Sequence, residues 1–191
     1  MTKNRIEAFS DGVLAIIVTI MVLEMKVPHS ADLEALKPIF PVFLSYILSF
    51  IFVLIYWNNH HHLFQTVKHV NGKVLWANGH LLFWLSLLPF VSGFMGENHF
   101  ESLPVLLYAI VALMAGVAYY VLTIQLVKIH DADSTLTKAV GKDKKGFISL
   151  ILYLMAVGFA YFYPIVSCAI FVGVAIMWFL PDKRIENTIT K

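Results

Sequence analysis

Long runs of apolar residues alternate with short polar segments along this chain. A helix rises about 1.5 Å per residue, so about 20 mainly apolar residues cross a hydrocarbon core of about 30 Å. The pattern predicts six spans in one domain, residues 1–182, followed by a short tail at 183–191. The spans are expected at residues 9–27, 40–58, 74–93, 103–127, 147–163 and 164–180. The last two form a hairpin, although one long tilted helix over residues 146–180 is an alternative.

The first span repeats branched apolar side chains along one side. Ile16, Thr19, Ile20 and Leu23 follow the spacing i, i+3, i+4, i+7, which places them on one helical face. In most membrane helices such residues face lipid or pack against neighbours. In a symmetric oligomer with this helix at its axis, each would form a ring, and stacked apolar rings make a constriction that gates by dewetting. The residues of one chain do not decide between the two.

Composition supports an integral membrane protein. Of the 191 residues, 59% are hydrophobic and 14% charged, and the mean hydropathy is +0.77. Soluble domains are usually about 45–50% apolar. The single cysteine, Cys168, excludes an intrachain disulfide and is best explained by packing. The first span lacks a signal-peptidase-like site, so we expect it to remain in the mature protein.

Basic residues divide unevenly between the two sides of the six-span pattern. Cytoplasmic loops of membrane proteins carry most of the Lys and Arg residues. If the N-terminus is in the cytoplasm, 12 of the 14 Lys and Arg residues of this chain lie on the cytoplasmic side. Lys26 and Lys37 remain outside with Asp32, Glu34, Glu97 and Glu101. Both termini are therefore expected in the cytoplasm. The inner set is Lys3, Arg5, Lys68, Lys73, Lys128, Lys138, Lys142, Lys144, Lys145, Lys183, Arg184 and Lys191.

Polar side chains gather at one membrane depth. Arg5, Ser10 and Asp11 stand at the entrance of the first span, residues 60–62 are three histidines at the inner end of the second, and Asn78 is near the start of the third. We expect one or two imidazoles to hydrogen-bond with Ser10, Asp11 or Asn78.

Two simpler roles remain open for the polar residues of the first span. Ser10 and Asp11 would cap the first helix, and Arg5 would anchor it at the headgroups.

Several function classes find no support in the sequence. Consecutive histidines on a helix point about 100° apart, so residues 60–62 cannot converge on one metal ion. No nucleophile–base pair or phosphate-binding loop indicates an enzyme, and no basic patch interleaved with aromatic residues indicates nucleic-acid binding. We expect no metal site and no cofactor.

A channel and a proton-coupled secondary transporter both suit polar groups inside a membrane. The transporter would use Asp11, Glu24 and the histidines as a proton relay. No mid-membrane Gly or Pro break marks a discontinuous helix in corresponding halves, which favours the channel.

The motif Arg5-x-x-x-Phe9-Ser10-Asp11 resembles the signature of the transmembrane protein 175 family of potassium channels, found in animal lysosomes and in prokaryotes. The resemblance extends to the six-span layout, the histidine-rich end of the second span, and Trp76 and Asn78. It covers most of one repeat. Animal members of the family carry two such repeats.

The resemblance implies a homotetramer with the first helix lining a central pore. The family's hydrophobic constriction falls on Ile16, continued by Ile20 and Leu23, with Thr19 as a polar layer. A polar network would bind the first three helices through Arg5, Phe9, Ser10, Asp11, His60, His61, Trp76 and Asn78.

The implied function is passive potassium permeation in the plasma membrane of a prokaryote. K⁺ would occupy the pore transiently, and the partners would be membrane lipid and three further copies of the chain. The Thr-Val-Gly-Tyr-Gly filter of ordinary potassium channels is absent from the family and from this sequence, so modest selectivity is expected.

Overall fold

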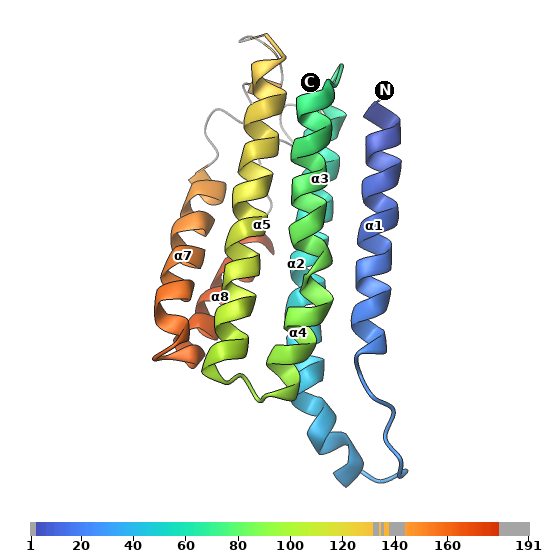
Figure 1. Ribbon diagram of the computed structural model, residues 1–191, viewed down its shortest axis with the longest axis vertical. Helices are drawn as coiled ribbons and strands as arrows, with labels where there is room; N and C mark the ends of the chain where they lie inside the picture. Colours follow the sequence, from blue (N-terminus) through green and yellow to red (C-terminus); the bar gives the residue numbers. More distant parts are fainter. Residues whose placement is uncertain (1–2, 132–133, 135, 138–143, 180–191) are drawn as a thin grey trace.

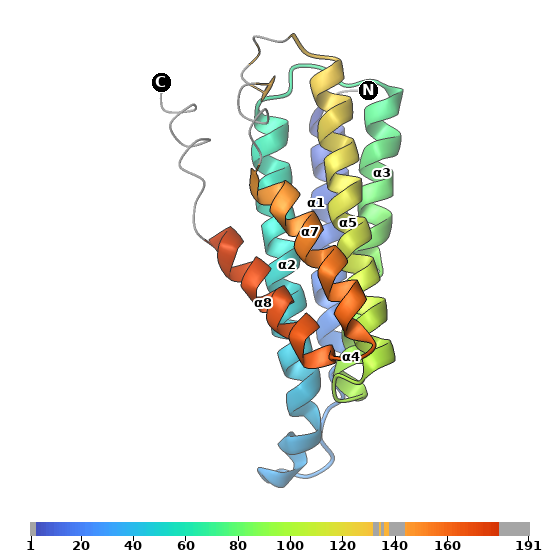
Figure 2. The ribbon, with the colours of Figure 1, turned by 90° about the vertical axis from the view of Figure 1, so that its left-hand side faces the viewer.

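The computed structural model describes residues 3–131, 134, 136–137 and 144–179, and this part of the chain is helical (Figure 1). Successive long helices run in opposite directions, so α2 and α5 end at the same end of the bundle where α1 starts (Figures 1 and 2). The elements are α1 (Lys3–Leu23), the 3-10 helix η1 (Glu34–Ile39), α2 (Phe40–Gln65), α3 (Gly72–Ser86), α4 (Leu88–Glu97), α5 (Ser102–Lys128), α7 (Lys144–Ala160) and α8 (Pro164–Phe179).

Four segments are long and apolar enough to cross a membrane. They are α1, η1 with α2, α3 with α4, and α5. The prediction of an all-helical protein with apolar membrane helices is therefore confirmed. The count of six spans and the single domain at 1–182 stay predictions, and the tail at 183–191 lies outside the described residues.

The last two helices form a hairpin. The chain turns between Ala160 and Pro164, where the Tyr163 N–H donates to the Phe159 carbonyl at 2.7 Å. One long helix over residues 146–180 is therefore wrong. With 17 and 16 residues, α7 and α8 extend only about 25 Å each. Both are inclined to α2 and α5 (Figure 2).

The first helix begins earlier than the apolar run predicts. It starts at Lys3 and ends at Leu23, whereas the span was expected at 9–27. Ser10 and Asp11 therefore lie two turns inside the helix, and the alternative in which they cap it is wrong. Hydropathy marks the part of a helix that suits lipid, and the polar residues before it are equally able to adopt helical geometry.

A one-residue break interrupts the third expected span. The helix over Gly72–Glu97 is divided at Leu87 into α3 and α4, which the uniform span at 74–93 did not anticipate. Pro89 explains the break, because its ring has no N–H and clashes with the carbonyl four residues before it. The Val91 N–H donates to the Leu87 carbonyl at 3.1 Å, so α4 continues below α3 (Figure 1).

The helices pack around α5, with α1 at one edge of the bundle. α5 contacts α3, α4, α7 and α8, while α1 contacts only α2, α3 and α4 among the principal packing partners (Figure 1).

α2 and α4 approach closely at Gly96. Nearby, the buried Ser49 hydroxyl bonds with Ser92 Oγ at 2.9 Å and with Tyr108 Oη at 3.1 Å, which joins α2, α4 and α5.

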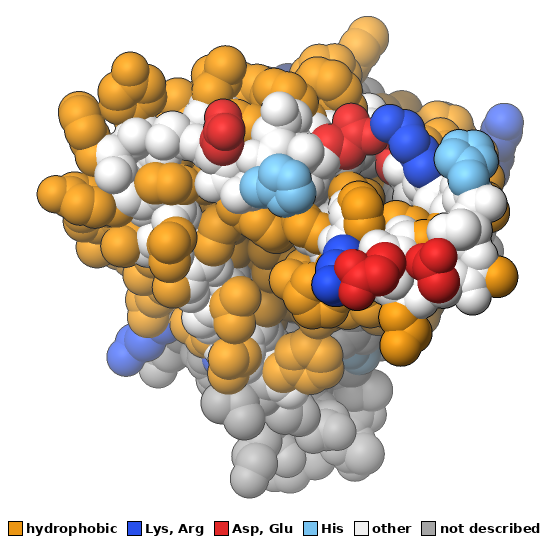
Figure 3. Space-filling view, turned by 90° about the horizontal axis from the view of Figure 1, so that it is seen from below, with side chains coloured by type: hydrophobic (Ala, Val, Ile, Leu, Met, Phe, Trp, Pro, Cys, Tyr) orange, Lys and Arg blue, Asp and Glu red, His pale blue; other side chains and the backbone are white. Residues whose placement is uncertain are grey.

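Acidic and basic side chains gather at the end of the bundle opposite the start of α1 (Figure 3). Lys26 donates to Glu97 Oε1 at 2.7 Å, and this hydrogen bond and charge raise the pKa of the Lys26 ammonium. Lys37 pairs with Glu34 in η1. The orientation relative to the membrane stays a prediction, and five of the basic residues behind it lie outside the described residues: Lys138, Lys142, Lys183, Arg184 and Lys191.

Gly96→Ala is expected to destabilise the protein by about 1–3 kcal/mol, since an added methyl group overpacks a tight contact. A Cβ there would lie 2.5 Å from Val42 Cα and 2.6 Å from Ser45 Oγ. Gly158→Ala is the matched control, because a Cβ at that helical glycine meets nothing within 4 Å in the chain. Thermal unfolding in detergent measures both, and equal melting temperatures for the two variants would refute the tight contact.

Candidate functional site

One face of α1 is buried against the rest of the bundle. Its buried residues recur every three or four positions and face α2, α3 and α4. Four of them are apolar and one, Ser10, is polar and fully buried. The set is Ile6, Ser10, Leu14, Ile17 and Met21.

Ser10, Asn78 and His60 form a hydrogen-bonded chain across three helices. Asn78 Nδ2 donates to Ser10 Oγ at 3.0 Å, and His60 Nε2 lies 2.8 Å from Asn78 Oδ1. A carboxamide oxygen only accepts, so His60 carries its proton on Nε2. All three residues are buried, with exposed fractions of 0–3%. This chain joins α1, α3 and α2, and it contains the expected hydrogen bond between one imidazole of the run and Asn78.

The three adjacent histidines have different surroundings. His60 faces inward, and its ring lies 4.4 Å from that of Phe64. His61 is exposed, and its Nε2 lies 2.8 Å from Gln65 Nε2, the amide donor. The buried Nδ1 of His62 has no hydrogen-bond partner within the described part of the chain. One imidazole of the run therefore joins the chain to Ser10.

Asp11 has a partner that the sequence interpretation missed. Trp57 Nε1 donates to Asp11 Oδ1 at 3.0 Å on the surface of the bundle. The indole also stacks on His61, with ring centroids 6.1 Å apart. Trp57 is four residues before His61, so helical spacing near the histidine run was the available signal.

Three residues of the predicted network lie apart from it in this chain. Arg5 and Phe9 are exposed on α1, and Trp76 is 84% exposed on α3. None of the three makes a side-chain hydrogen bond or ion pair with another described residue. Lys3 instead ties the start of α1 to the end of α2, because its Nζ donates to the Phe64 carbonyl at 3.2 Å.

The opposite face of α1 carries the four residues expected to line a pore. Ile16 is 58% exposed, Ile20 40% and Leu23 80%, and Thr19 is also exposed. The Thr19 hydroxyl donates to the Ile16 carbonyl at 2.8 Å, so its oxygen lone pairs stay available on this face. The structure of one chain thus leaves an apolar stripe with a single hydroxyl layer uncovered.

Metal-binding side chains are not clustered in the described residues. No group of three or more His, Cys, Asp or Glu side chains there is placed to hold an ion. Cys168 is partly buried in α8.

Comparison with known proteins places this arrangement in a family. A model described as the endosomal/lysosomal potassium channel TMEM175 matches residues 5–89. A protein of Chryseobacterium sp. (strain P1-3), named a potassium channel, is 51% identical over 189 residues, covering 99% of this chain and 98% of that protein. The chain belongs to the TMEM175 family. Its helices make it a multi-pass membrane protein.

A TMEM175 relative of known structure has the same fold. The crystal structure of a lysosomal potassium-selective channel TMEM175 homolog from Chamaesiphon minutus matches with a TM-score of 0.78 and 27% identity, covering 93% of this chain and 96% of that one. A chicken relative, named an endosomal/lysosomal proton channel, is 30% identical over an alignment of 133 residues that covers 61% of this chain and 26% of that protein. The region matched by the TMEM175 model runs from α1 into α4 and contains the Ser10–Asn78–His60 chain.

Asn78→Ala is expected to lower the stability of the folded protein by about 1–3 kcal/mol, because it leaves the Ser10 hydroxyl and the His60 N–H without partners in the core. Asp11→Ala should cost less, since its bond to Trp57 is exposed to solvent or headgroups. Thermal unfolding of the purified protein measures both. Asn58→Ala, at an exposed asparagine on α2, is the control, and a matching loss there would remove the special role of Asn78.

Proposed function

We propose that four copies of this chain form a potassium-permeable cation channel, with α1 of each copy lining a central pore. The proposal places the channel in the plasma membrane of a prokaryote, among membrane lipids and with both termini in the cytoplasm. K⁺ passes through without a cofactor and without a chemical reaction. The names of the relatives, potassium channel and potassium-selective channel, support this function class.

The observation that carries the proposal is the two-sided character of α1. One face is buried against α2, α3 and α4, while the other exposes Ile16, Thr19, Ile20 and Leu23 at the edge of the bundle. A helix at an edge is accessible to the same helix of other copies. Around a fourfold axis, each exposed residue becomes a ring of four.

The gate follows from the chemistry of those rings. Water is unstable in a narrow pore with apolar walls, such as one formed by stacked rings of Ile16, Ile20 and Leu23 side chains. The pore therefore loses its water at this level and does not conduct ions. A small widening admits water and restores conduction. The Thr19 ring offers four hydroxyl oxygens to a partly dehydrated cation, because each hydroxyl proton already points to the Ile16 carbonyl.

The polar chain behind α1 sets the rotation of the pore helix. Turning α1 about its axis would move Ser10 away from Asn78. The Ser10 hydroxyl and the Asn78 amide would then be buried without a hydrogen-bond partner for each other. Ser10 and Ile16 are six residues apart on a rigid helix, so the same bonds direct Ile16 toward the pore axis. Asp11 and His61, joined through Trp57, lie at the inner entrance.

The arrangement of the ionisable residues disfavours a proton-coupled transporter. Asp11 bonds with Trp57, and Glu24 is thirteen residues further along, just beyond the end of α1 and about 20 Å away at the helical rise. The Glu24 carboxylate lies beside Gly93, where a Cβ would be 3.5 Å from Oε2. Transporters typically have a broken helix at corresponding positions in both halves of the fold. The break at Leu87 is of this kind, but within the described residues no second break interrupts α1, α2 or α5.

Replacing Ile16 with Asn is expected to raise K⁺ conductance severalfold, because four carboxamides would keep the constriction wet. Single-channel recording in planar bilayers measures the change. Ile176→Asn is the matched control, since Ile176 has a similar exposed fraction, 60%, on α8 at the far side of the bundle from α1. Unaltered conductance in a correctly assembled Ile16→Asn channel would exclude Ile16 from the pore.

Liposomes that contain the purified protein and a K⁺ gradient are expected to pass K⁺ without any proton gradient. Na⁺ should pass more slowly, and N-methylglucamine should be excluded by size. Uptake of a tracer cation into the vesicles gives the three rates. Flux that starts only when a pH gradient is imposed would show the transporter instead.

A further inference from the structure

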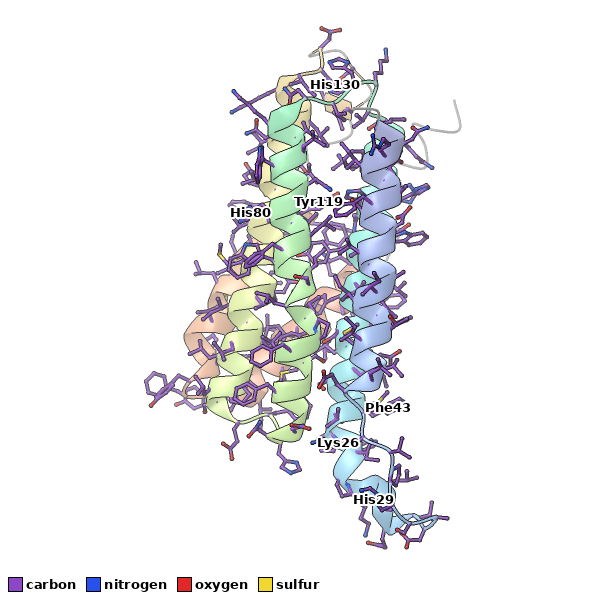
Figure 4. All side chains as sticks on the ribbon, turned by 45° about the vertical axis from the view of Figure 1, so that its right-hand side comes forward. Lys26, His29, Phe43, His80, Tyr119 and His130 are labelled. Atoms are coloured by element: carbon purple, nitrogen blue, oxygen red, sulfur yellow. The ribbon has the colours of Figure 1, made fainter. Side chains whose placement is uncertain are left out.

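Two histidines lie stacked at the end of the bundle that holds the start of α1. His69 belongs to the connection between α2 and α3, and His130 follows α5. Their ring centroids are 4.6 Å apart, with an angle of 20° between the ring planes. Figure 4 labels His130 at this end, beyond the last turn of α5. The pair, called here the His69–His130 clasp, is separate from the Ser10–Asn78–His60 chain.

Hydrogen bonds define the protonation state of His130 in the clasp. Its Nδ1 lies 2.8 Å from the Leu126 carbonyl, which only accepts, so Nδ1 carries a proton. Its Nε2 accepts the backbone N–H of Lys68 at 3.1 Å, so Nε2 carries none. His130 is therefore neutral. His69 Nε2 lies 2.8 Å from the Ile129 carbonyl and donates to it.

We propose that the His69–His130 clasp is a pH-sensitive latch, which holds the α2–α3 connection on the end of α5 at neutral pH and releases it on acidification. A proton added to His130 Nε2 would turn this nitrogen into a donor. Because the Lys68 N–H is also a donor, the hydrogen bond between the two groups would be lost. If His69 also gained a proton, two stacked cations would repel. Imidazole is the side chain that ordinarily changes charge between about pH 5 and 8.

Ion pairs do not stabilise the His69–His130 clasp within the described residues. The ionisable neighbours on the joined segments are Lys68 beside His69, and Lys128 and Asp131 on either side of His130. Lys73 is the second residue of α3, and His62 is in the last turn of α2. Within the described residues none of these five forms an ion pair with either imidazole. The latch therefore rests on the ring stack and the three hydrogen bonds to backbone groups.

The released connection would affect the helices that carry His60 and Asn78. Residues 66–71 join the end of α2 to the start of α3, and the clasp pins their middle to α5. Opening it would loosen the end of α2 and the start of α3. The latch does not require the proposed ion conduction, so a structural measurement tests it alone.

Backbone hydrogen exchange of the full-length protein in lipid nanodiscs tests the latch. The Lys68 amide is a direct reporter, because its N–H is the one donated to His130. Exchange of residues 66–71 would be followed by mass spectrometry at about pH 7.5 and about pH 5.5, with labelling times scaled for the slower chemical exchange in acid. Protection of Lys68 is expected to fall about fivefold at the acidic pH, which corresponds to the loss of one hydrogen bond.

Three variants make the result specific. His130→Gln keeps an oxygen that accepts from Lys68 but cannot take up a proton, so its protection should be the same at both pH values. His69→Gln keeps a donor for Ile129 and removes one potential cation, so it should lose less protection in acid than the wild type. His29→Gln changes an exposed histidine at the opposite end of the bundle and should behave like the wild type (Figure 4). Wild-type protection that is independent of pH, or an undiminished acid response in His130→Gln, would overturn the latch.

Discussion

A hydroxyl, a carboxamide and an imidazole buried among apolar helices must satisfy one another, because neither lipid nor water is available to them. Ser10, Asn78 and His60 meet this requirement with two hydrogen bonds of 3.0 and 2.8 Å. Each residue comes from a different helix, so satisfying them positions α1, α2 and α3 together. The rest of α1, including the face that it turns away from the bundle, takes its orientation from this contact.

That orientation separates two surfaces of one helix. The buried side of α1 packs with four apolar side chains and one serine, and the exposed side presents an apolar stripe with one hydroxyl layer. Apolar side chains on a membrane helix experience no strong preference between lipid and protein. The serine supplies the directional bond that apolar packing lacks, which explains how a helix with apolar residues on both sides adopts one rotation.

The lengths of the apolar runs were sufficient to predict one contact of this site, the hydrogen bonding between Asn78 and an imidazole of the histidine run. Those lengths predicted a shared membrane depth for Ser10, the histidine run and Asn78, and the structure joins Ser10, Asn78 and one of the histidines, His60. Which histidine turns inward depends on the rotation of α2, and adjacent positions differ by about 100°. Trp57 was overlooked because an aromatic residue at the end of a membrane helix has an ordinary role as an interfacial anchor. The break at Leu87 had a visible cause in Pro89, yet proline is tolerated within membrane helices.

The sequence by itself determined that the chain is a helical membrane protein, because apolar run length and loop charge depend only on local composition. It also determined the face shared by Ile16, Thr19, Ile20 and Leu23, since helical spacing is a property of one segment. The tertiary structure alone decided that this face is uncovered while Ser10 is buried, and that His60 rather than His61 bonds with Asn78. It also brought together His69 and His130, which are about 60 positions apart in the chain. Such pairings depend on how helices rotate and pack against one another, and that information is distributed over the whole bundle.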